Sequence, residues 1–160
     1  MYRRPELLTG WGRTAPSSAT VALPAPGEDP APLLTEVTAD PVLSRRGLVA
    51  RGLGRSYGDA AQNGGGLVLT LPPGGLRLDQ QAGTLTADAG TSIDEILRVI
   101  VPQGWFVPVT AGTRYITVGG AIAADIHGKN HHCDGTFGAH VRALDLLTAH
   151  SLGAQAARIG

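Results

Sequence analysis

The sequence predicts an α+β fold in which loops build the ligand site. Short strand patterns and one clear helical pattern follow each other in an irregular order, unlike the repeated strand–helix alternation of a parallel α/β sheet. The 23 glycines are clustered, and clustered glycine is typical of loops whose backbone takes positive φ or approaches a ligand closely. With 160 residues, 42% of them hydrophobic, the chain is long enough for one domain with a buried core.

Composition excludes several classes of function. The 13 basic residues balance the 13 acidic ones, and aromatic residues make up only 4%, so we expect no nucleic-acid partner. The single cysteine rules out an internal disulfide. The basic N-terminus MYRRPELLTGWGRT has no apolar stretch behind it, so it does not resemble a signal peptide. No apolar run approaches the ~20 residues of a membrane span. We therefore expect a protein in the cytoplasm or at the membrane periphery.

The first half of the chain predicts a leader, a short helix and four strands. Residues 1–19 have the pattern of an irregular leader with a turn in LLTGWG. Residues 20–46 are rich in Pro and Ala and predict a short helix near Ala31–Thr38, which Pro41 ends. The strands are expected in GLVAR (47–51), GLVLT (66–70), LRLD (76–79) and TLTAD (84–88), the last two joined by a hairpin turn in QQAG.

The second half contains the strongest helix signal. Ser92 and Glu95 form a capping box before a stretch with isoleucine and leucine at helical spacing. WFVPV (105–109) predicts a strand, TVGGAIAAD a short helix of small residues capped by Thr117, and His140–Ala149 a strand. The last residues, HSLGAQAARIG, have little strand pattern, and we expect residues 150–160 to form an aberrant or unstructured tail.

The loop GLGRSYG (52–58) follows a predicted strand, as a dinucleotide-binding fingerprint does. However, its third glycine comes one position late, and the following DAAQNGGG cannot form the required helix. A glycine-rich turn can still present successive N–H groups as an anion site, with Arg55 adding charge and Ser56 a hydroxyl. The alternative is an ordinary connector between two strands.

A second loop, HGKNHHC (127–133), combines histidines, a lysine and the chain's cysteine. Three interpretations are open: a metal site, a site with Cys133 as nucleophile, and a polar loop without chemistry. No standard zinc spacing is present, and no evident triad accompanies the cysteine. The small residues of TVGGAIAADI directly before the loop favour a flat ligand lying on the glycines.

Together, RGLGRSYGDAAQNGGG and TAGTRYITVGGAIAADIHGKNHHCDGTFGAHVRALDLLTA resemble the FAD-binding domain of the vanillyl-alcohol-oxidase / p-cresol-methylhydroxylase-type flavoproteins. Within that superfamily the likeness is to the decaprenylphosphoryl-ribose 2′-oxidases, the flavin subunits of a ribose-to-arabinose epimerase of cell-wall arabinan synthesis. LLTGWGRTAPS also resembles the start of those proteins. The resemblance implies two small mixed subdomains with FAD between them.

The resemblance also implies roles for individual residues. The pyrophosphate would lie on the first loop, at Gly52, Leu53, Gly54, Arg55, Ser56, Tyr57 and Gly58, and Ala61 would also bind the cofactor. The flavin and its phosphates would be lined by Gly112, Thr113, Thr117, Gly119, Gly120, Ile126, His127 and Gly128. The substrate side would hold the catalytic candidates His127, Lys129 and Tyr57, and no metal is implied.

The reaction implied is oxidation of a CH–OH group of a sugar, here the 2′-hydroxyl of a polyprenyl-phosphoryl ribose, by hydride transfer to FAD. Related sugar oxidases carry a histidine in the first loop that bonds covalently to FAD. Arg55 stands at that position, which implies non-covalent FAD. A reductase-type epimerase partner is implied as well.

The sequence departs from the family after residue 149, where the rest of the FAD domain and a substrate domain would follow. We therefore expect residues 20–149 to be a partial FAD-binding domain, a fragment that is inactive alone. The alternatives are a truncated product without enzymatic function and a metal-binding protein that uses His127–Cys133.

Overall fold

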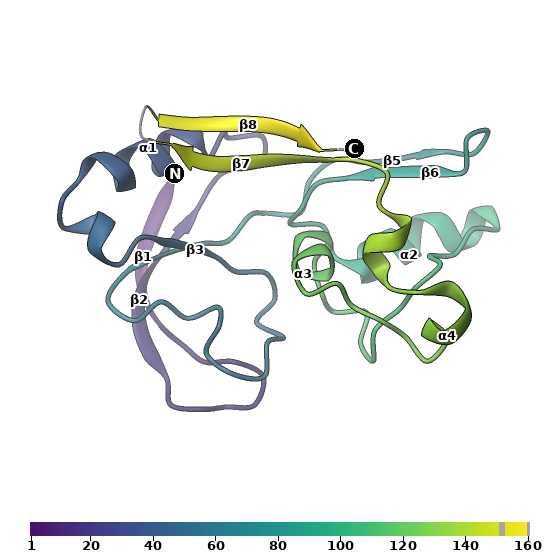
Figure 1. Ribbon diagram of the computed structural model, residues 1–160, viewed down its shortest axis with the longest axis horizontal. Helices are drawn as coiled ribbons and strands as arrows, with labels where there is room; N and C mark the ends of the chain where they lie inside the picture. Colours follow the sequence, from purple (N-terminus) through teal and green to yellow (C-terminus); the bar gives the residue numbers. More distant parts are fainter. Residues whose placement is uncertain (151–152, 160) are drawn as a thin grey trace. The chain divides into compact units, whose positions relative to one another are not determined.

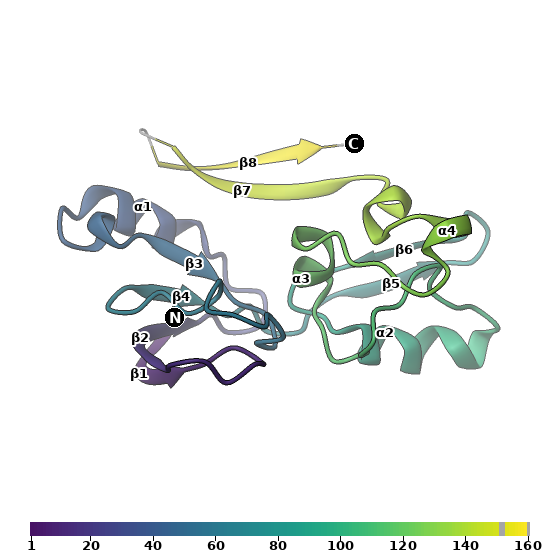
Figure 2. The same ribbon diagram turned by 60° about the horizontal axis from the view of Figure 1, so that its bottom comes forward.

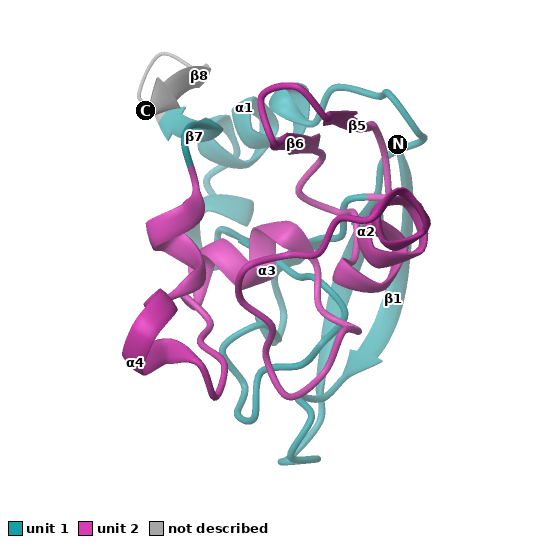
Figure 3. Cartoon of the chain, turned by 90° about the vertical axis from the view of Figure 1, so that its right-hand side faces the viewer, with its two compact units in different colours: residues 1–71, 142–160 teal, residues 72–141 magenta. Residues whose placement is uncertain are grey.

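The computed structural model describes residues 1–150 and 153–159. The chain forms two compact units, shown in different colours in Figure 3. Unit 1 comprises Met1–Leu71 and Arg142–Gly160, and unit 2 comprises Pro72–Val141. The mixture of short strands and helices in both units confirms the predicted α+β class.

Unit 1 is built on a four-stranded sheet with the order β1-β2-β4-β3, which can be followed in Figure 2. Its strands are β1 (Tyr2–Leu8), β2 (Ser17–Leu23), β3 (Leu48–Ala50) and β4 (Leu67–Leu69). β1 pairs antiparallel with β2, whereas β2 and β3 both pair parallel with β4. The predicted strands within residues 47–51 and 66–70 are confirmed.

The central strands β2 and β4 of this sheet are buried on both faces. On one face Ala22 and Leu67 pack against Leu33 and Val37 of helix α1 (Ala31–Ala39). On the other face Val21 and Val68, which are partners in the register, pack with Leu8 and Ala19. Neighbouring strand residues point to opposite faces, and this explains why β4 is apolar throughout. Helix α1 confirms the predicted helix, and a 3₁₀ turn, η1 (Leu43–Arg45), follows it.

The irregular leader predicted for residues 1–19 is wrong, because most of it forms β1 and the start of β2. β1 is an edge strand, and all its residues before Leu8 except Glu6 are exposed. The charged residues and Pro5 suit an edge strand, but they hide the alternation that marks a half-buried strand. Pairing with β2, rather than local pattern, defines this strand.

Within the tail predicted for residues 150–160, residues 150 and 153–159 form strands and differ from the prediction, while residues 151, 152 and 160 lie outside the described residues. Strand β7 (Leu144–His150) pairs antiparallel with β8 (Gly153–Ile159) along its whole length. Helix α1 lies beside both strands within unit 1 (Figure 1). Pairing with β7 satisfies the backbone groups of β8 that face this strand, so β8 forms without a strongly apolar pattern. The predicted strand His140–Ala149 is confirmed from Leu144 onward, since His140 ends the 3₁₀ turn η3 (Phe137–His140).

Unit 2 contains a hairpin, two helices that build its core and a set of short turns. β5 (Leu76–Asp79) and β6 (Thr84–Ala87) pair antiparallel, and Gly83 takes φ +61° in the predicted turn. Helix α2 (Ile93–Ile100) and helix α3 (Val118–Ala123) are where the sequence predicts them. The remaining turns are η2 (Val101–Gln103) and α4 (His131–Asp134), the latter within the predicted histidine loop.

One face of α2 forms the centre of the hydrophobic core of unit 2. Ile93, Ile96 and Ile100 are at most 3% exposed and pack with Ile116 and Ala121. Partly buried side chains of β5, β6, η3 and the segments between them surround this cluster. The helical spacing of the isoleucines therefore marks the buried face correctly.

The strand predicted for WFVPV (105–109) is wrong. Exposure does alternate there, since Phe106 is 64% exposed while Val109 is completely buried. However, no strand pairs with this segment in the described part of the chain, and Pro108 has no N–H to donate to a ladder.

No helix among the described residues is long and apolar enough to cross a membrane.

Candidate functional site

In unit 1, residues 51–66 connect the parallel strands β3 and β4 without a helix. A parallel connection normally contains a helix, and the dinucleotide-binding βαβ unit requires one. The absence of a helix between these two strands excludes that fold, as the sequence predicts. The connection is instead a glycine-rich loop that neighbouring segments hold in place.

Arg51, at the start of this loop, bonds to a later part of the loop and to the segment between β1 and β2. Its guanidinium donates from Nη1 to the Ala61 carbonyl and from Nη2 to the Thr9 carbonyl, both at 2.8 Å. A Cβ at Gly54 would lie 2.4 Å from Nη2 of Arg51, and Gly54 has φ +68°. Glycine is therefore required at position 54 by both the backbone conformation and the neighbouring guanidinium.

The loop uses its carbonyls and leaves its N–H groups free. The carbonyls of Ser56 and Tyr57 accept bonds of 2.7 and 3.1 Å from the N–H groups of Trp11 and Gly12. Within residues 1–150 and 153–159, no N–H group from position 52 to position 61 donates a hydrogen bond. Unpaired N–H groups on a glycine loop can act as hydrogen-bond donors to an anion.

Arg55 adds the positive charge to this surface. Its guanidinium lies 4.6 Å from the ring centroid of Trp11, and its Nη1 donates to the Leu53 carbonyl at 3.0 Å. No carboxylate of the described residues pairs with Arg55. Its charge therefore remains available to a ligand.

The far end of GLGRSYG faces open space. A Cβ at Gly58 would meet no atom within 4 Å, and the Tyr57 side chain is 79% exposed. Leu53 is 46% exposed, and Ser56 is exposed as well. Residues 52–58 are thus exposed or partly exposed, and Ala61 accepts a hydrogen bond from Arg51.

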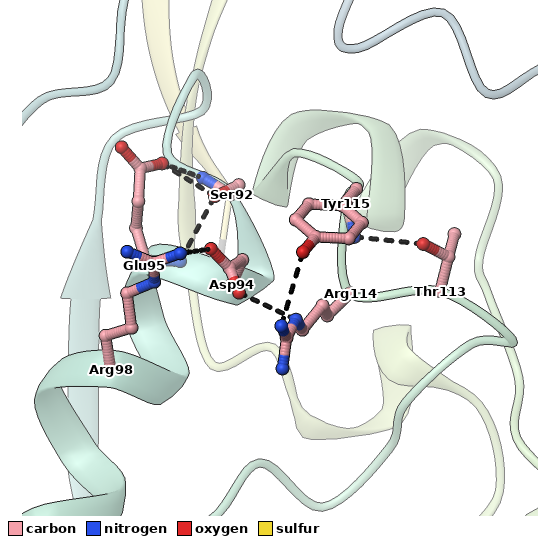
Figure 4. A network of polar contacts seen from close by, with 7 residues as sticks. All are labelled: Ser92, Asp94, Glu95, Arg98, Thr113, Arg114 and Tyr115. Atoms are coloured by element: carbon pink, nitrogen blue, oxygen red, sulfur yellow. Dashed lines mark hydrogen bonds and ion pairs between the residues drawn. The ribbon is translucent and has the colours of Figure 1, made fainter.

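In unit 2, a polar network holds the segment that leads into α3 (Figure 4). Asp94 is buried at the start of α2 and pairs with Arg98 at 2.9 Å and with Arg114 Nε at 2.7 Å. Arg114 also donates to the Tyr115 hydroxyl at 3.2 Å. This bond, followed by the negative charge of Asp94, raises the pKa of the Arg114 guanidinium above its usual value.

The capping box at the start of α2 has the predicted geometry. Glu95 N–H donates to Ser92 Oγ at 3.1 Å, and Ser92 N–H donates to Glu95 Oε2 at 2.8 Å. These bonds to Ser92 lower the pKa of the Glu95 carboxyl. Ser92 also bridges to Thr117, so α2 fixes the cap of α3.

The glycines of α3 are explained mainly by packing inside unit 2. Thr117 Oγ1 accepts from Gly120 N–H at 3.1 Å, and Gly119 N–H donates to Ala89 at 2.9 Å. A Cβ at Gly119 would lie 3.1 Å from the Ala89 Cβ.

Gly112, which precedes α3, differs from these glycines, because a Cβ there would meet nothing within 4 Å. Thr113 accepts from Tyr115 N–H at 3.1 Å.

Several side chains of the histidine loop form hydrogen bonds within or next to the loop. His131 Nδ1 lies 2.9 Å from the Gly128 carbonyl, and His140 Nε2 lies 2.8 Å from the Asp134 carbonyl. Asn130 Nδ2 donates to Pro108 at 2.9 Å and to Asp134 at 2.7 Å. These bonds shape the loop.

His127 and Lys129 are exposed. The His127 ring has an edge contact with the His131 ring at 5.3 Å between centroids. Gly128 between them must be glycine, since a Cβ there would lie 2.6 Å from the Thr110 carbonyl oxygen. Ile126 packs against the core, and its carbonyl accepts from Phe137 N–H at 2.8 Å. His132 and Cys133 are exposed as well, so exposure alone does not distinguish His127 and Lys129 from the rest of the loop.

Metal binding by this loop gains no support from the geometry. Over the residues that the structure describes, no three His, Cys, Asp or Glu side chains come together in a group that could hold a metal ion. Cys133 is exposed.

Sequence reasoning missed the part of the site that lies before the glycine loop. Gly10, Trp11 and Gly12 contact residues 56–58, and a Cβ at Gly10 would lie 2.0 Å from the Gly58 carbonyl oxygen. Gly-Trp-Gly between two strands is a signal for close backbone approach, but the loop that it approaches is remote in sequence.

Residues 42–151 match the model of a family described as an FAD binding domain. The chain belongs to this family. It is also 51% identical over 145 residues to decaprenylphosphoryl-β-D-ribose oxidase of Mycolicibacterium smegmatis. The match covers 89% of this chain and 31% of the oxidase, so the chain spans less than a third of the relative's length.

Solved structures agree on the fold. Alkyldihydroxyacetonephosphate synthase matches 88% of this chain with a TM-score of 0.67 and 15% identity, over 27% of its own length. Cholesterol oxidase from Brevibacterium sterolicum matches 79% with a TM-score of 0.64 and 17% identity, over 25% of its own length. These comparisons confirm the expected p-cresol-methylhydroxylase-type FAD-binding fold and the resemblance from which it was inferred.

Proposed function

We propose that this chain binds FAD non-covalently and is the cofactor-binding part of a flavin-dependent oxidase of a sugar CH–OH group. The observation that carries the proposal is the loop from Gly52 to Ala61, whose N–H groups are unpaired while its carbonyls are held from outside. Such a loop suits the pyrophosphate of FAD, and the family supplies the identity of the ligand.

In this proposal the N–H groups of the loop and the Arg55 guanidinium hold the negative charges of the two phosphates. Arg55 is suited to this role because its charge is not neutralised by a carboxylate of the described chain. No histidine lies between Gly52 and Gly66, which supports non-covalent binding. In unit 2, Gly112 offers backbone with open space beside it, and the Ile126–Gly128 backbone is the proposed border of the flavin.

FAD, when bound, accepts the hydride from the carbon that is oxidised. The substrate hydroxyl must lose a proton at the same time, and the proposed groups beside it are His127, Lys129 and Tyr57. All three side chains are exposed. Imidazole suits proton acceptance near neutral pH, and the Lys129 ammonium suits orientation of a polar or anionic substrate.

The substrate class follows from the relative, which is named as an oxidase of decaprenylphosphoryl-β-D-ribose. We propose a polyprenyl-phosphoryl ribose as substrate, oxidised at its 2′-hydroxyl to the ketone. A reductase-type partner that reduces the ketone would complete the epimerisation. Because this sequence spans 31% of the relative, we propose that turnover requires the remaining length and that residues 1–160 alone do not oxidise the sugar.

Two glycine variants test FAD binding directly. In Gly58→Val and Gly112→Val the added Cβ would meet no atom within 4 Å other than those of its chain neighbours, so the Cβ itself creates no clash in the protein. We expect each to weaken FAD binding at least about tenfold, which is about 1.4 kcal/mol. The measurement is titration of flavin fluorescence with purified protein.

Gly75→Ala is the matched control, because its Cβ would make only ordinary contacts with Asp88, the nearest at 3.7 Å. It should leave FAD binding unchanged. If both valine variants bind FAD as well as the original chain, the proposed surface is wrong. If the original chain itself binds no FAD, the proposal fails for these 160 residues.

A further inference from the structure

The segment that connects β1 and β2 is hydrogen-bonded to the glycine loop. This segment lies before residue 42, where the match to the FAD-binding family model begins. Arg51 bonds the Thr9 carbonyl from within the loop. Gln62, which is 3% exposed, donates from Nε2 to the Ala15 carbonyl at 3.2 Å and to Ser17 Oγ at 3.0 Å. The segment Thr9–Ser17 is thus bonded to the loop near both of its ends.

The middle of the segment fixes the part of the loop that carries Arg55. Trp11 and Gly12 donate their N–H groups to the carbonyls of Ser56 and Tyr57. This ladder turns two loop carbonyls toward the segment and leaves the N–H groups of the loop unpaired. It also places the Trp11 ring, which is 56% exposed, under the Arg55 guanidinium at 4.6 Å.

The contact has a consequence for binding. A free arginine side chain loses rotamer freedom when it grips an anion, and that loss weakens the complex. Arg55 is already restrained on one side by the Trp11 ring and on the other by the Leu53 carbonyl. The ring holds the guanidinium without neutralising its charge, as a carboxylate would.

We propose that Trp11 is a positioning residue for FAD, which holds Arg55 over the glycine loop in the orientation that receives the cofactor's phosphates. The proposal rests on the proposed function, since the phosphates are those of FAD. It assigns a cofactor role to a residue outside the matched family domain. Trp11 itself need not touch the cofactor.

The first test needs no ligand. In the ¹⁵N-labelled chain, the Arg55 side-chain Nε–H signal should be shifted upfield by the ring current of Trp11. Trp11→Leu should remove this shift, and Trp11→Phe, which keeps a ring, should retain part of it. Tyr2→Leu is the control, because Tyr2 is another exposed aromatic side chain of the same N-terminal segment, at 62% exposure. An Arg55 signal that does not change in Trp11→Leu would overturn the proposal.

The second test is a double-mutant cycle on FAD affinity. Trp11→Leu should weaken FAD binding about two- to fivefold in the original chain, the range of an exposed cation–π contact. In an Arg55→Gln background it should have no further effect, since no charge is left to position. Trp11→Phe should restore most of the affinity. An equal loss in both backgrounds would show that Trp11 acts independently of Arg55, and the proposal would be wrong.

The two proposals can fail separately. If the original chain binds no FAD, the proposed function fails for these residues, and the same cycle is then measured with inorganic pyrophosphate. Trp11→Leu weakening pyrophosphate binding only when Arg55 is present supports the positioning role. Binding of neither ligand, or weakening that does not depend on Arg55, refutes it.

Discussion

Removal of the Ser92 hydroxyl tests the link between α2 and the segment that enters α3. Ser92→Ala eliminates the bond from Glu95 N–H to Ser92 Oγ and the bond from Ser92 Oγ to Glu95 Oε2 at 2.7 Å. The backbone bond from Ser92 N–H to the same carboxylate can persist. One half of the capping box is therefore lost and the other half retained.

The expected cost follows from burial. Loss of an N-cap costs about 0.5–2 kcal/mol, and Ser92 is only 8% exposed, so water replaces the lost bonds poorly. We place the decrease in the free energy of unfolding at about 1–1.5 kcal/mol. Urea unfolding followed by far-UV circular dichroism measures it. Ser44→Ala, an exposed serine in η1, should change stability by less than about 0.5 kcal/mol.

The stabilisation by the Ser92–Glu95 capping box should depend on pH. Bonds to Ser92 lower the Glu95 pKa in the folded chain, so their contribution is present above the unfolded glutamate pKa of about 4.3. It is lost as pH falls through the lower folded value. The difference in stability between the original chain and Ser92→Ala should therefore shrink below about pH 4. A difference that is absent at pH 7, or that grows on acidification, would refute this account of the cap.

Two further predictions concern the core and the histidine loop. Ile96→Ala should reduce the free energy of unfolding by about 2–5 kcal/mol, because Ile96 is 1% exposed. Val99→Ala, on the exposed side of α2, should cost less than about 1 kcal/mol. Similar losses for the two variants in urea unfolding would contradict the assigned core. In a fusion of this sequence to the remaining length of the mycobacterial relative, His127→Gln should lower sugar-oxidation turnover at least about tenfold, while Cys133→Ser should change it little. Equal and mild effects in the stopped-flow assay would show that His127 has no special role.

Local signals explain which parts of the fold were predictable. The box of Ser92 and Glu95 and the spacing of Ile93, Ile96 and Ile100 lie within one helix, so sequence alone predicts its start and buried face. The same holds for the hairpin around Gly83, whose strands are close neighbours in the chain. These elements need no information from remote residues.

Remote pairing explains the failures. β1 and β8 are strands because β2 and β7 pair with them, although their own residues give a weak strand pattern. Residues 105–109 show the opposite case, with the alternation of a strand but no partner among the described residues.

For the candidate site, motif resemblance selected residues 52–58 and 126–129, and the structure shows what the motif alone does not. Gly54 takes a positive φ and lies close to the Arg51 guanidinium, and a Cβ at Gly119 would be in tight contact with Ala89. The Trp11 contact with Arg55 joins residues that are remote in the chain, and no local pattern predicts it. Glycine in a motif can therefore serve the packing of the loop as well as a ligand.

The measurement that tests the central claim most directly is titration of the ¹⁵N-labelled chain with FAD, followed by the backbone amide signals. We predict that the signals of residues 52–61 shift together in one saturable process, because their N–H groups are the unpaired donors of the loop. The amides of Trp11 and Gly12, which donate to loop carbonyls, should shift less. Binding that leaves residues 52–61 unchanged, or no binding at all, would contradict the account.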